Sequence, residues 1–181
     1  MHNRKYKIKF LIIFTIIIIV NIAASLFPLK LDLTEDKRYS IASETESILK
    51  ELDDKIYIKV YLKGEFPAGF KHLQQATKNL LRNFKKIAGE KIIFEFINPS
   101  ASSDEKERLA IYKQLVEYKL TPTDIEIRKA DKRMNQIVFP GAIIYYKDKH
   151  ISVNFLKNNI SNSPEENINS SVENLEFEFI N

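Results

Sequence analysis

One uninterrupted apolar stretch near the N-terminus constrains this chain more than any other feature. From Phe10 to Phe27 the sequence reads FLIIFTIIIIVNIAASLF, about 18 residues without a charge. At ~1.5 Å per residue, such a helix is about 27 Å long, close to the ~30 Å hydrocarbon thickness of a bilayer. Because no face of the segment is polar, a buried helix of a globular core explains it less well. We therefore predict a transmembrane anchor at residues 10–27.

The charges around this stretch predict its orientation. The basic segment of residues 1–9 should stay in the cytoplasm and send the C-terminal side of the anchor outward. A cleaved signal peptide is the alternative, since Ala23, Ala24 and Ser25 are small residues near a candidate cleavage site. Signal-peptide apolar regions usually have about 7–15 residues, so the longer run favours an uncleaved anchor. In either case we expect an exported domain at residues 28–157.

Charge and cysteine content exclude several function classes. The formal net charge of the chain is +4. Residues 1–27 hold four basic residues and no acid, so the remaining residues sum to zero. A domain of zero net charge has no general attraction for phosphates, which leaves only a local basic patch open, and we expect no nucleic-acid partner. The absence of cysteine excludes disulfides, thiolate metal sites and thiol nucleophiles.

The periodicity of the first half of the domain predicts alternating helices and strands. Ser40 is a suitable N-cap for a helix that reaches about Leu52, and the period-two pattern of residues 56–62 predicts a strand. A long amphipathic helix is expected at residues 70–87, ended by Gly89. Residues 91–97 read KIIFEFI, which indicates an inner strand covered on both faces.

The second half predicts one helix and several strands. Ser102 and Glu105 form a candidate capping box for a helix reaching about Tyr118, with Leu109, Tyr112, Leu115 and Val116 on its apolar side. Residues 123–129 read as a short strand, residues 130–135 as a polar loop and residues 136–140 as a further extended segment. Residues 141–146 and 150–156 should pair as a hairpin across Asp148 and Lys149. The polar tail from residue 157 to 171 reads as a linker. Helical spacing follows in residues 168–179, so we expect residues 158–181 to be a polar linker and the start of a truncated helix.

This order of elements predicts an α/β fold. A strand–helix–strand unit needs a right-handed crossover with parallel strands, and the closing hairpin adds antiparallel strands. We expect a mixed sheet of four to five strands with flanking helices, preceded by the transmembrane helix.

The chain lacks the usual signals of an enzyme or a metal site. His2, His72 and His150 show no metal-binding spacing, and neither GxSxG nor GxxxxGK[ST] occurs. The acids Glu95, Asp124 and Glu126 lie on or beside strands at positions that alternation directs largely to solvent. We therefore expect no catalytic residue, no cofactor and no metal.

The element order resembles the thioredoxin-like fold. Residues 139–150, FPGAIIYYKDKH, are similar to the proline-led hairpin that closes such folds, in which the proline is cis and faces the active-site loop. The resemblance implies a cis bond between Phe139 and Pro140. Where the redox members place their cysteine pair, this chain has residues 63–69, KGEFPAG, so the fold would serve as a binding scaffold.

Two loops are the candidate binding or partner surface in such a fold. They would lie near the proline of the hairpin, at the carboxyl ends of the parallel strands, where ligands of open α/β sheets usually bind. The alternative is that the two phenylalanines simply fill the core beneath the first loop. The candidate residues are Phe66, Pro67, Gly69, Phe70, Asn98, Pro99, Pro140 and Gly141.

At the level of the whole chain, several blocks look like the GldG family, a gliding motility-associated ABC transporter component of Bacteroidota. The blocks are residues 32–41, 64–71, 94–99, 139–142 and 169–179. The resemblance implies a non-enzymatic inner-membrane subunit, single-pass, with its N-terminus inside and its C-terminal domain in the periplasm. It would act as an auxiliary, substrate-binding-like component with an ABC permease and, through it, a cytoplasmic ATPase. Family members are much longer than this chain. A free-standing anchored domain that binds a ligand or peptide is the alternative.

Overall fold

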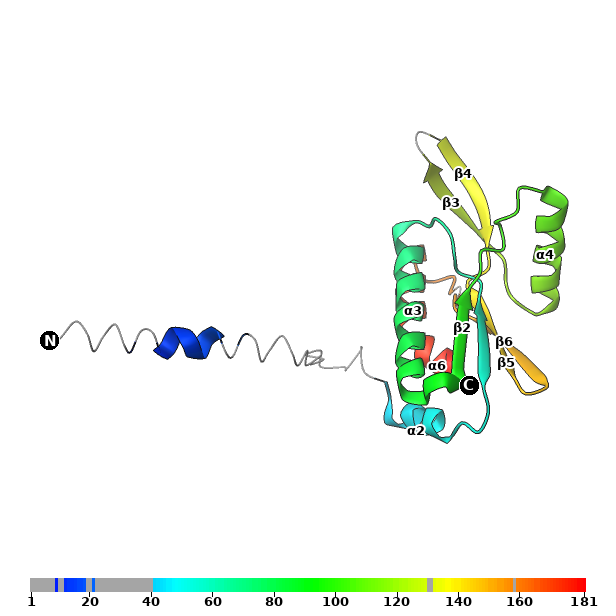
Figure 1. Cartoon of the computed structure of the whole chain (residues 1–181). Coiled ribbons are helices and arrows are strands. Elements are labelled where there is room, and N and C mark those ends of the chain that lie inside the picture. The colour runs from blue at the N-terminus through cyan, green and yellow to red at the C-terminus, as the bar shows by residue number, and fades with distance from the viewer. Residues whose placement is uncertain (1–8, 10–11, 19–20, 22–40, 130–131, 158) are drawn as a thin grey trace. The chain divides into compact units, whose positions relative to one another are not determined.

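The structure is a computed structural model in which we describe residue 9, residues 12–18, residue 21 and residues 41–129, 132–157 and 159–181 (Figure 1). The chain divides into two compact units, residues 1–40 and residues 41–181.

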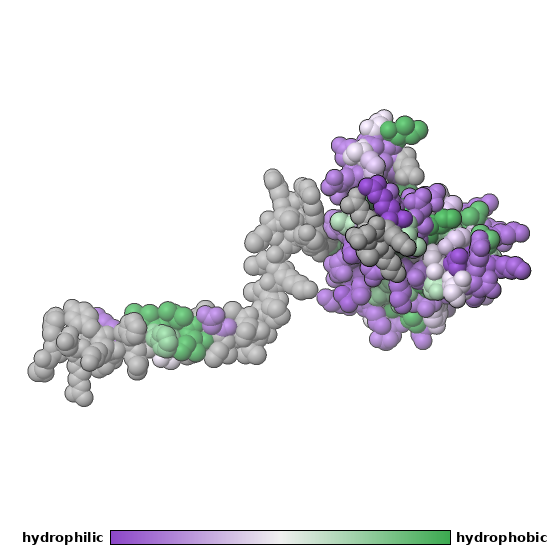
Figure 2. Space-filling model, turned by 90° about the horizontal axis from the view of Figure 1, so that it is seen from above, coloured by the Kyte–Doolittle hydropathy of each residue, from purple (hydrophilic) through white to green (hydrophobic). Residues whose placement is uncertain are grey.

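The first unit contains part of the predicted anchor. Residues 12–18 are helical, and their large apolar side chains are about half exposed, as for Ile13 at 58%. They form a hydrophobic surface in Figure 2. Among the residues described, no helix has both the length and the apolar character needed to cross a membrane. Apart from Asn21, the rest of the predicted anchor lies outside the described residues, as do the spacer that follows it and the predicted N-cap Ser40.

The second unit alternates helices and strands and then closes with hairpins and two helices. Its elements are α2 (Ser43–Glu51), β1 (Ile56–Val60), α3 (Ala68–Ala88), the 3₁₀ turn η1 (Gly89–Lys91), β2 (Ile92–Phe96), α4 (Glu105–Glu117), β3 (Thr123–Lys129), β4 (Lys132–Val138), β5 (Gly141–Tyr146), β6 (Lys149–Asn154), α5 (Pro164–Glu173) and α6 (Leu175–Ile180).

Four strands form a mixed central sheet in the order β2-β1-β5-β6. Strands β1 and β2 are parallel, with Ile58 opposite Phe94, as a right-handed crossover through α3 requires. Strand β5 runs antiparallel to β1, with Ile144 opposite Ile58, and β6 runs antiparallel to β5. The predicted mixed α/β sheet with flanking helices is confirmed. Strands β3 and β4 form a separate antiparallel pair.

The helices cover the two faces of this sheet unequally (Figure 1). Helices α2, α3, α5 and α6 contribute to a large buried cluster on one face, together with Ile58 and Val60 of β1. Helix α4 lies on the other face, over a small cluster of Leu115, Leu120, Phe139 and Ile143. We call these the α3 face and the α4 face.

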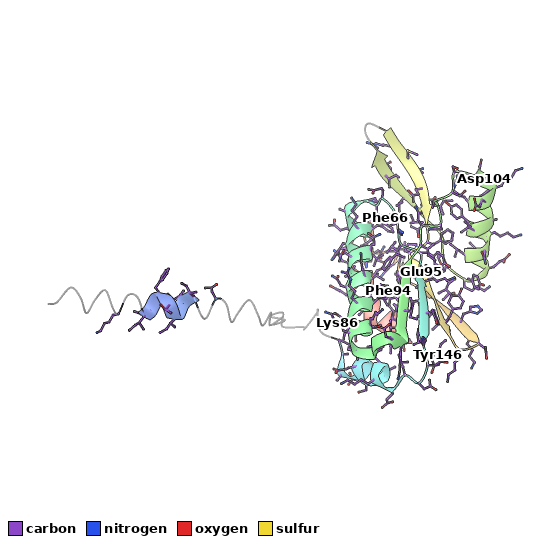
Figure 3. All side chains as sticks on the ribbon, in the orientation of Figure 1. Phe66, Lys86, Phe94, Glu95, Asp104 and Tyr146 are labelled. Carbon is purple, nitrogen blue, oxygen red and sulfur yellow. The ribbon has the colours of Figure 1, made fainter. Side chains whose placement is uncertain are left out.

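Strand β2 does not occupy the predicted position. It was expected inside the sheet, but it is an edge strand, because β5 occupies the other side of β1. Ile92 is buried, and Glu95 is exposed on the α4 face (Figure 3). The apolar run of residues 91–97 reflects packing on the two faces of the strand. It does not show whether the strand lies inside the sheet or at its edge.

The expected loop at residues 130–135 is also wrong in part. Residues 132–138 form β4, which pairs with β3 from Thr123↔Val138 to Lys129↔Lys132. A β-strand rich in polar residues carries a weak hydrophobic pattern, so the pairing with β3 decides its structure. The β5–β6 turn lies one residue earlier than predicted: Tyr146 pairs with Lys149, and Lys147 takes a left-handed backbone with φ 53°.

Helix α4 departs from its prediction in its cap and its apolar side. Its N-cap is Asp104, whose carboxylate accepts from the amide of Lys106, and the predicted capping box of Ser102 with Glu105 is wrong. Ser102 instead donates its hydroxyl to Glu107 at 2.5 Å. Of the predicted apolar side, Leu115 is buried, whereas Leu109 and Val116 are about half exposed.

The tail predicted as a linker contains α5. Ser163 and Glu166 form a capping box, with Pro164 in the first turn of the helix. Asn167 and Ile168 are buried, and α5 packs on α3. The sequence SPEE at residues 163–166 carries this start signal, but the abundance of polar residues obscures it.

Candidate functional site

The two predicted loops meet at the carboxyl ends of β1 and β2. Phe66, in the loop after β1, and Asn98 and Pro99, after β2, line one recess. A Cβ atom placed on Gly64 would lie 3.5 Å from the Phe66 ring and 3.9 Å from Nδ2 of Asn98. The strand–helix–strand connection therefore brings together residues more than thirty positions apart.

This recess is filled. Phe66 and Phe70 are only 6% and 8% exposed, and their ring centroids lie 6.3 Å apart. The recess has no internal space for a water molecule. The alternative in which both phenylalanines fill the core beneath the loop describes the structure, and the predicted open crevice does not.

The remaining predicted site residues have structural roles. Pro67 is the N-cap of α3, and Gly69 lies against α5, where an added Cβ would approach Cδ1 of Ile168 to 2.8 Å. The carbonyl of Pro140 accepts from the amide of Phe155 at 2.8 Å, and that of Gly141 accepts from Tyr61 at 2.9 Å.

The Phe139–Pro140 bond is trans, since the described residues contain no cis peptide bond. The predicted cis bond is therefore wrong. Both Phe139 and Pro140 are buried. Gly141 is required for close packing, because a Cβ there would lie 2.6 Å from the carbonyl oxygen of Val153 and 2.7 Å from Cδ2 of Leu120.

Ser100 joins this end of the sheet to α4 and β4, a role that the sequence did not indicate. Its hydroxyl lies 2.7 Å from the hydroxyl of Tyr112 and donates to the carbonyl of Ile137 at 3.2 Å. Its amide donates to the side chain of Asn98 at 3.0 Å. These bonds hold the loop after β2 in one conformation, which favours a rigid surface.

A second, open groove lies between the start of α3 and the chain around α5. Its volume is about 340 Å³, and its walls include Phe70, Asp124, Leu156, Asn159 and Ile168. Asn159 and Asn167 hold one side of it through two reciprocal bonds of 3.0 and 3.1 Å between backbone and side-chain amide groups. Of the predicted residues, Phe70 alone contributes to this groove.

The α4 face carries a tyrosine cluster that the sequence analysis missed. Burial raises the pKa of Tyr61 to about 12 and also raises the pKa of Tyr145, to which the neighbouring Tyr118 adds a smaller contribution. The His150 ring packs on Tyr118 with centroids 5.1 Å apart, and Nζ of Lys59 lies 5.6 Å from the Tyr145 ring centroid. With these raised pKa values, the phenols of Tyr61 and Tyr145 stay protonated at neutral pH, so they offer hydrogen bonds and ring faces but no nucleophile. Tyr145 lies opposite His150 in the pairing of β5 with β6. The sequence analysis did not predict that these two side chains would be neighbours.

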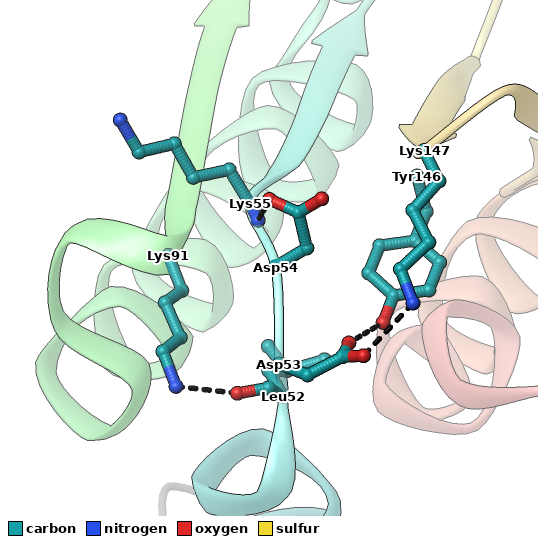
Figure 4. A network of polar contacts seen from close by, with 7 residues as sticks. All are labelled: Leu52, Asp53, Asp54, Lys55, Lys91, Tyr146 and Lys147. Atoms are coloured by element: carbon teal, nitrogen blue, oxygen red, sulfur yellow. Dashed lines mark hydrogen bonds and ion pairs between the residues drawn. The ribbon is translucent and has the colours of Figure 1, made fainter.

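A polar network joins the loop after α2 to the β5–β6 turn (Figure 4). The Asp53 carboxylate accepts from the Tyr146 hydroxyl and from Nζ of Lys147, the latter at 2.8 Å. The hydrogen bond from Lys147, followed by that from Tyr146, lowers the pKa of Asp53 to about 2. Asp53 and Lys147 are exposed to solvent and Tyr146 is partly exposed, so these three residues, which we call the surface clasp, form a network at the surface.

The acids and histidines expected at the surface form no metal site in the part of the chain that the structure describes. No group of three His, Asp or Glu side chains there lies within reach of one ion. Glu95, Asp124 and Glu126 are exposed, and Glu126 pairs with Arg133 at 3.7 Å.

Comparison with known proteins identifies a family without a described activity. The family described as "Domain of unknown function (DUF7088)" matches residues 35–145. No curated protein matches the chain, and no solved structure does.

Proposed function

The chain belongs to the DUF7088 family, a domain of unknown function, and from this premise we propose that it is a non-enzymatic periplasmic subunit of a GldG-type ABC transporter associated with gliding motility. In this role the domain is an auxiliary component that works through contacts with an ABC permease and, through the permease, a cytoplasmic ATPase. Residues 10–27 anchor it in the inner membrane as a single pass, with the N-terminus in the cytoplasm.

The observation that carries this proposal is the packing of the blocks that resemble the GldG family. The block of residues 64–71 meets the block of residues 94–99 in the recess that Phe66, Asn98 and Pro99 line. The block of residues 169–179 adds Leu175, which is buried with α3 in one cluster. Blocks far apart in the sequence thus form one packed unit, as expected if they were retained together for one fold.

The arrangement of the sheet also supports a thioredoxin-like fold as the finer description. A parallel strand–helix–strand unit, β1–α3–β2, is extended by the antiparallel hairpin β5–β6, and helices lie on both faces. The filled recess at the carboxyl ends of β1 and β2 favours a scaffold that presents a surface to a protein over one that encloses a small molecule there. The trans bond at Pro140 is a departure from the resemblance.

Purification of the full-length chain from its native membrane tests the proposal. A C-terminal affinity tag would be used with mild detergent, and the co-purifying proteins would be quantified by mass spectrometry. A permease and an ATPase should be recovered in amounts close to that of the tagged chain. A full-length chain recovered intact but without a permease would contradict the proposal.

The open groove favours a second candidate function, a free-standing anchored domain that binds a ligand or peptide. Its volume of about 340 Å³ lies at the low end of small-molecule sites. Substituting Phe70→Ala would widen it, and Asn162→Trp would obstruct it. If the groove binds a peptide, the Asn162→Trp protein should purify without that peptide, whereas the Phe70→Ala protein should retain it. If both variants retain the permease equally, the groove does not contribute to the transporter contact.

A further inference from the structure

Helix α3 carries a row of positive charge on its solvent side. The helix has 21 residues and includes five Lys or Arg residues but no acid. All five side chains are exposed, while the opposite side of the helix is buried in the core. We call this set the α3 basic row; it consists of Lys71, Lys78, Arg82, Lys85 and Lys86.

The spacing of the row makes it straight. Lys71, Lys78, Arg82 and Lys85 recur at intervals of seven, four and three residues, which return to the same side of an α-helix. At ~1.5 Å per residue the row is about 21 Å long. Lys86 adds a charge beside its end and is labelled on the outer side of α3 in Figure 3.

The described domain leaves this charge largely unneutralised. Lys85 lies 4.0 Å from Glu90, whose side chain is 89% exposed. Within the described residues the other four make no ion pair. The pairs Lys78–Arg82 and Arg82–Lys86 place like charges four residues apart, which destabilises a helix. Lys85 and Lys86 lie in the last turn of α3, where they complement the helix dipole, but Lys71, Lys78 and Arg82 bring the fold no such gain. The row is therefore available to an anionic surface outside the molecule.

We propose that the α3 basic row docks on the anionic headgroups of a phospholipid bilayer, so that α3 lies along the membrane surface. This inference rests on the membrane anchoring included in the proposed function. A straight row of Lys and Arg on one side of a rigid helix matches a flat anionic surface, and each such residue near the headgroups adds to the attraction.

The place where the chain enters the domain favours a membrane over an acidic protein. Helix α2 packs against α3, and Ile41, just before α2, packs against the same core. The 13 residues 28–40 reach at most about 45 Å when fully extended, so an anchored domain enters beside α3 and stays close to the bilayer. Exposed Glu44 and Glu51 on α2 confine the contact to the length of α3.

The absence of cysteine allows a direct test with the full-length chain. A single cysteine introduced by Gln75→Cys, within the row and exposed, would carry a fluorophore. The matched control is Ala110→Cys on α4, where position 110 is also exposed. Each labelled chain would be reconstituted into vesicles of phosphatidylcholine alone, or with about one third phosphatidylglycerol, containing lipid with a headgroup quencher. We expect strong quenching at position 75 only in the anionic vesicles, and weak quenching at position 110 in both.

Charge changes then test the row itself. In the Gln75→Cys background, Lys78→Glu with Arg82→Glu should reduce the docked-to-free ratio about tenfold or more, since several favourable contacts become repulsive. Lys106→Glu with Lys113→Glu on α4 changes the charge equally and should leave the ratio unaltered. If the reversed pair fails to fold, as judged by circular dichroism, Lys78→Gln with Arg82→Gln replaces it. High salt should weaken the wild-type quenching.

Equal quenching at position 75 in both vesicle types would overturn the inference, as would equal effects of the α3 and α4 pairs. Carbonate extraction of the same vesicles reports separately on the anchor. A chain that carbonate removes from the vesicles, but that floats with anionic vesicles before this treatment, docks on the surface without a membrane-spanning anchor. If the chain does not dock on anionic vesicles but the permease is still recovered in the purification, this inference alone is overturned. If the chain docks but the permease is not recovered, only the proposed function is overturned.

Discussion

On the α3 face of the sheet, Ile58 and Val60 belong to a buried cluster that draws on four helices. On the α4 face, Ile143 belongs to a cluster of four fully buried residues beneath one helix. The same sheet is therefore covered deeply on one side and thinly on the other. Tyr57 is 47% exposed on the thin side, although its neighbour Ile58 is buried on the other.

The two faces also differ in how their helices are held. The N-cap residue of α2 is Ala42, which has no side chain that could cap the helix. The carboxylate of Glu176 on α6 instead accepts from the Ala42 amide at 2.9 Å and from the hydroxyl of Thr45 at 2.5 Å. Helix α4 is capped by its own Asp104. The cap of α2 thus depends on a long-range contact and the cap of α4 on a local one. Because the buried cluster of the α3 face is also the larger of the two, we expect the α3 face to control global unfolding.

The largest expected difference concerns buried leucines on the two faces. Leu73→Ala removes a fully buried side chain of α3 and should lower the free energy of unfolding by about 4 kcal/mol. Leu115→Ala on α4 should cost about 2 kcal/mol, because half-exposed neighbours can close part of the cavity. Urea denaturation measures both. Equal losses, or a larger loss at Leu115, would break the comparison.

The next effect concerns Gly141, which lies against Val153 of the α3-face cluster and Leu120 of the α4-face cluster. Gly141→Ala places a Cβ against the carbonyl oxygen of Val153 and the side chain of Leu120, and should cost about 2–3 kcal/mol through overpacking. Gly89→Ala is the matched control. Its Cβ would meet open space, but its backbone, with φ 65° and ψ −135°, has a conformation that favours glycine, so about 1–2 kcal/mol is expected. Thermal unfolding at the two sites in the opposite order would contradict the packing of Gly141.

A smaller effect separates long-range from local capping. Glu176→Gln and Asp104→Ala should each lower stability by about 1 kcal/mol. They should differ in what opens, as hydrogen exchange can measure. The first should speed exchange in both α2 and α6, and the second in α4 alone. Faster exchange confined to α6 in the Glu176 variant would remove the role of that carboxylate as the cap of α2.

The smallest effect is the pH dependence of the surface clasp. Because the folded-state pKa of Asp53 is lowered from 3.8 to about 2, its stabilisation is complete above about pH 4 and is lost as the pH falls towards 2. Asp53→Asn should therefore lower the melting temperature slightly at pH 7, and the difference from the wild type should vanish near pH 2. High salt should also shrink it, since the groups are exposed. A difference that grows below pH 4 would show that another group carries the effect.

Local pattern predicted much of the fold, and the reason differs by element. Strand β1 alternates strictly, and the apolar side of α3 repeats over 21 residues, so each element specifies itself. Strand β4 and helix α5 have weak patterns. Their structure depends on pairing with β3 and packing on α3, which a short stretch of sequence does not contain.

The candidate site divides in the same way. The recess brings Phe66 to Asn98 and Pro99, as the thioredoxin-like arrangement implied for parallel β1 and β2, but Pro140, expected beside them, does not line it. Whether Phe66 and Phe70 opened a crevice or filled it depended on the volume left between α3 and the sheet. The packing of many side chains sets that volume, and here it leaves none.

The amino-acid sequence by itself determined the α/β class, the core-facing side of α3 and the composition of the α3 basic row, because these follow from the spacing of residue types along one element. Tertiary structure alone decided the edge position of β2, the filled recess and the trans bond at Pro140. It also decided that the basic row has few partners. These properties depend on which elements become neighbours, and that choice is made by packing the whole domain at once.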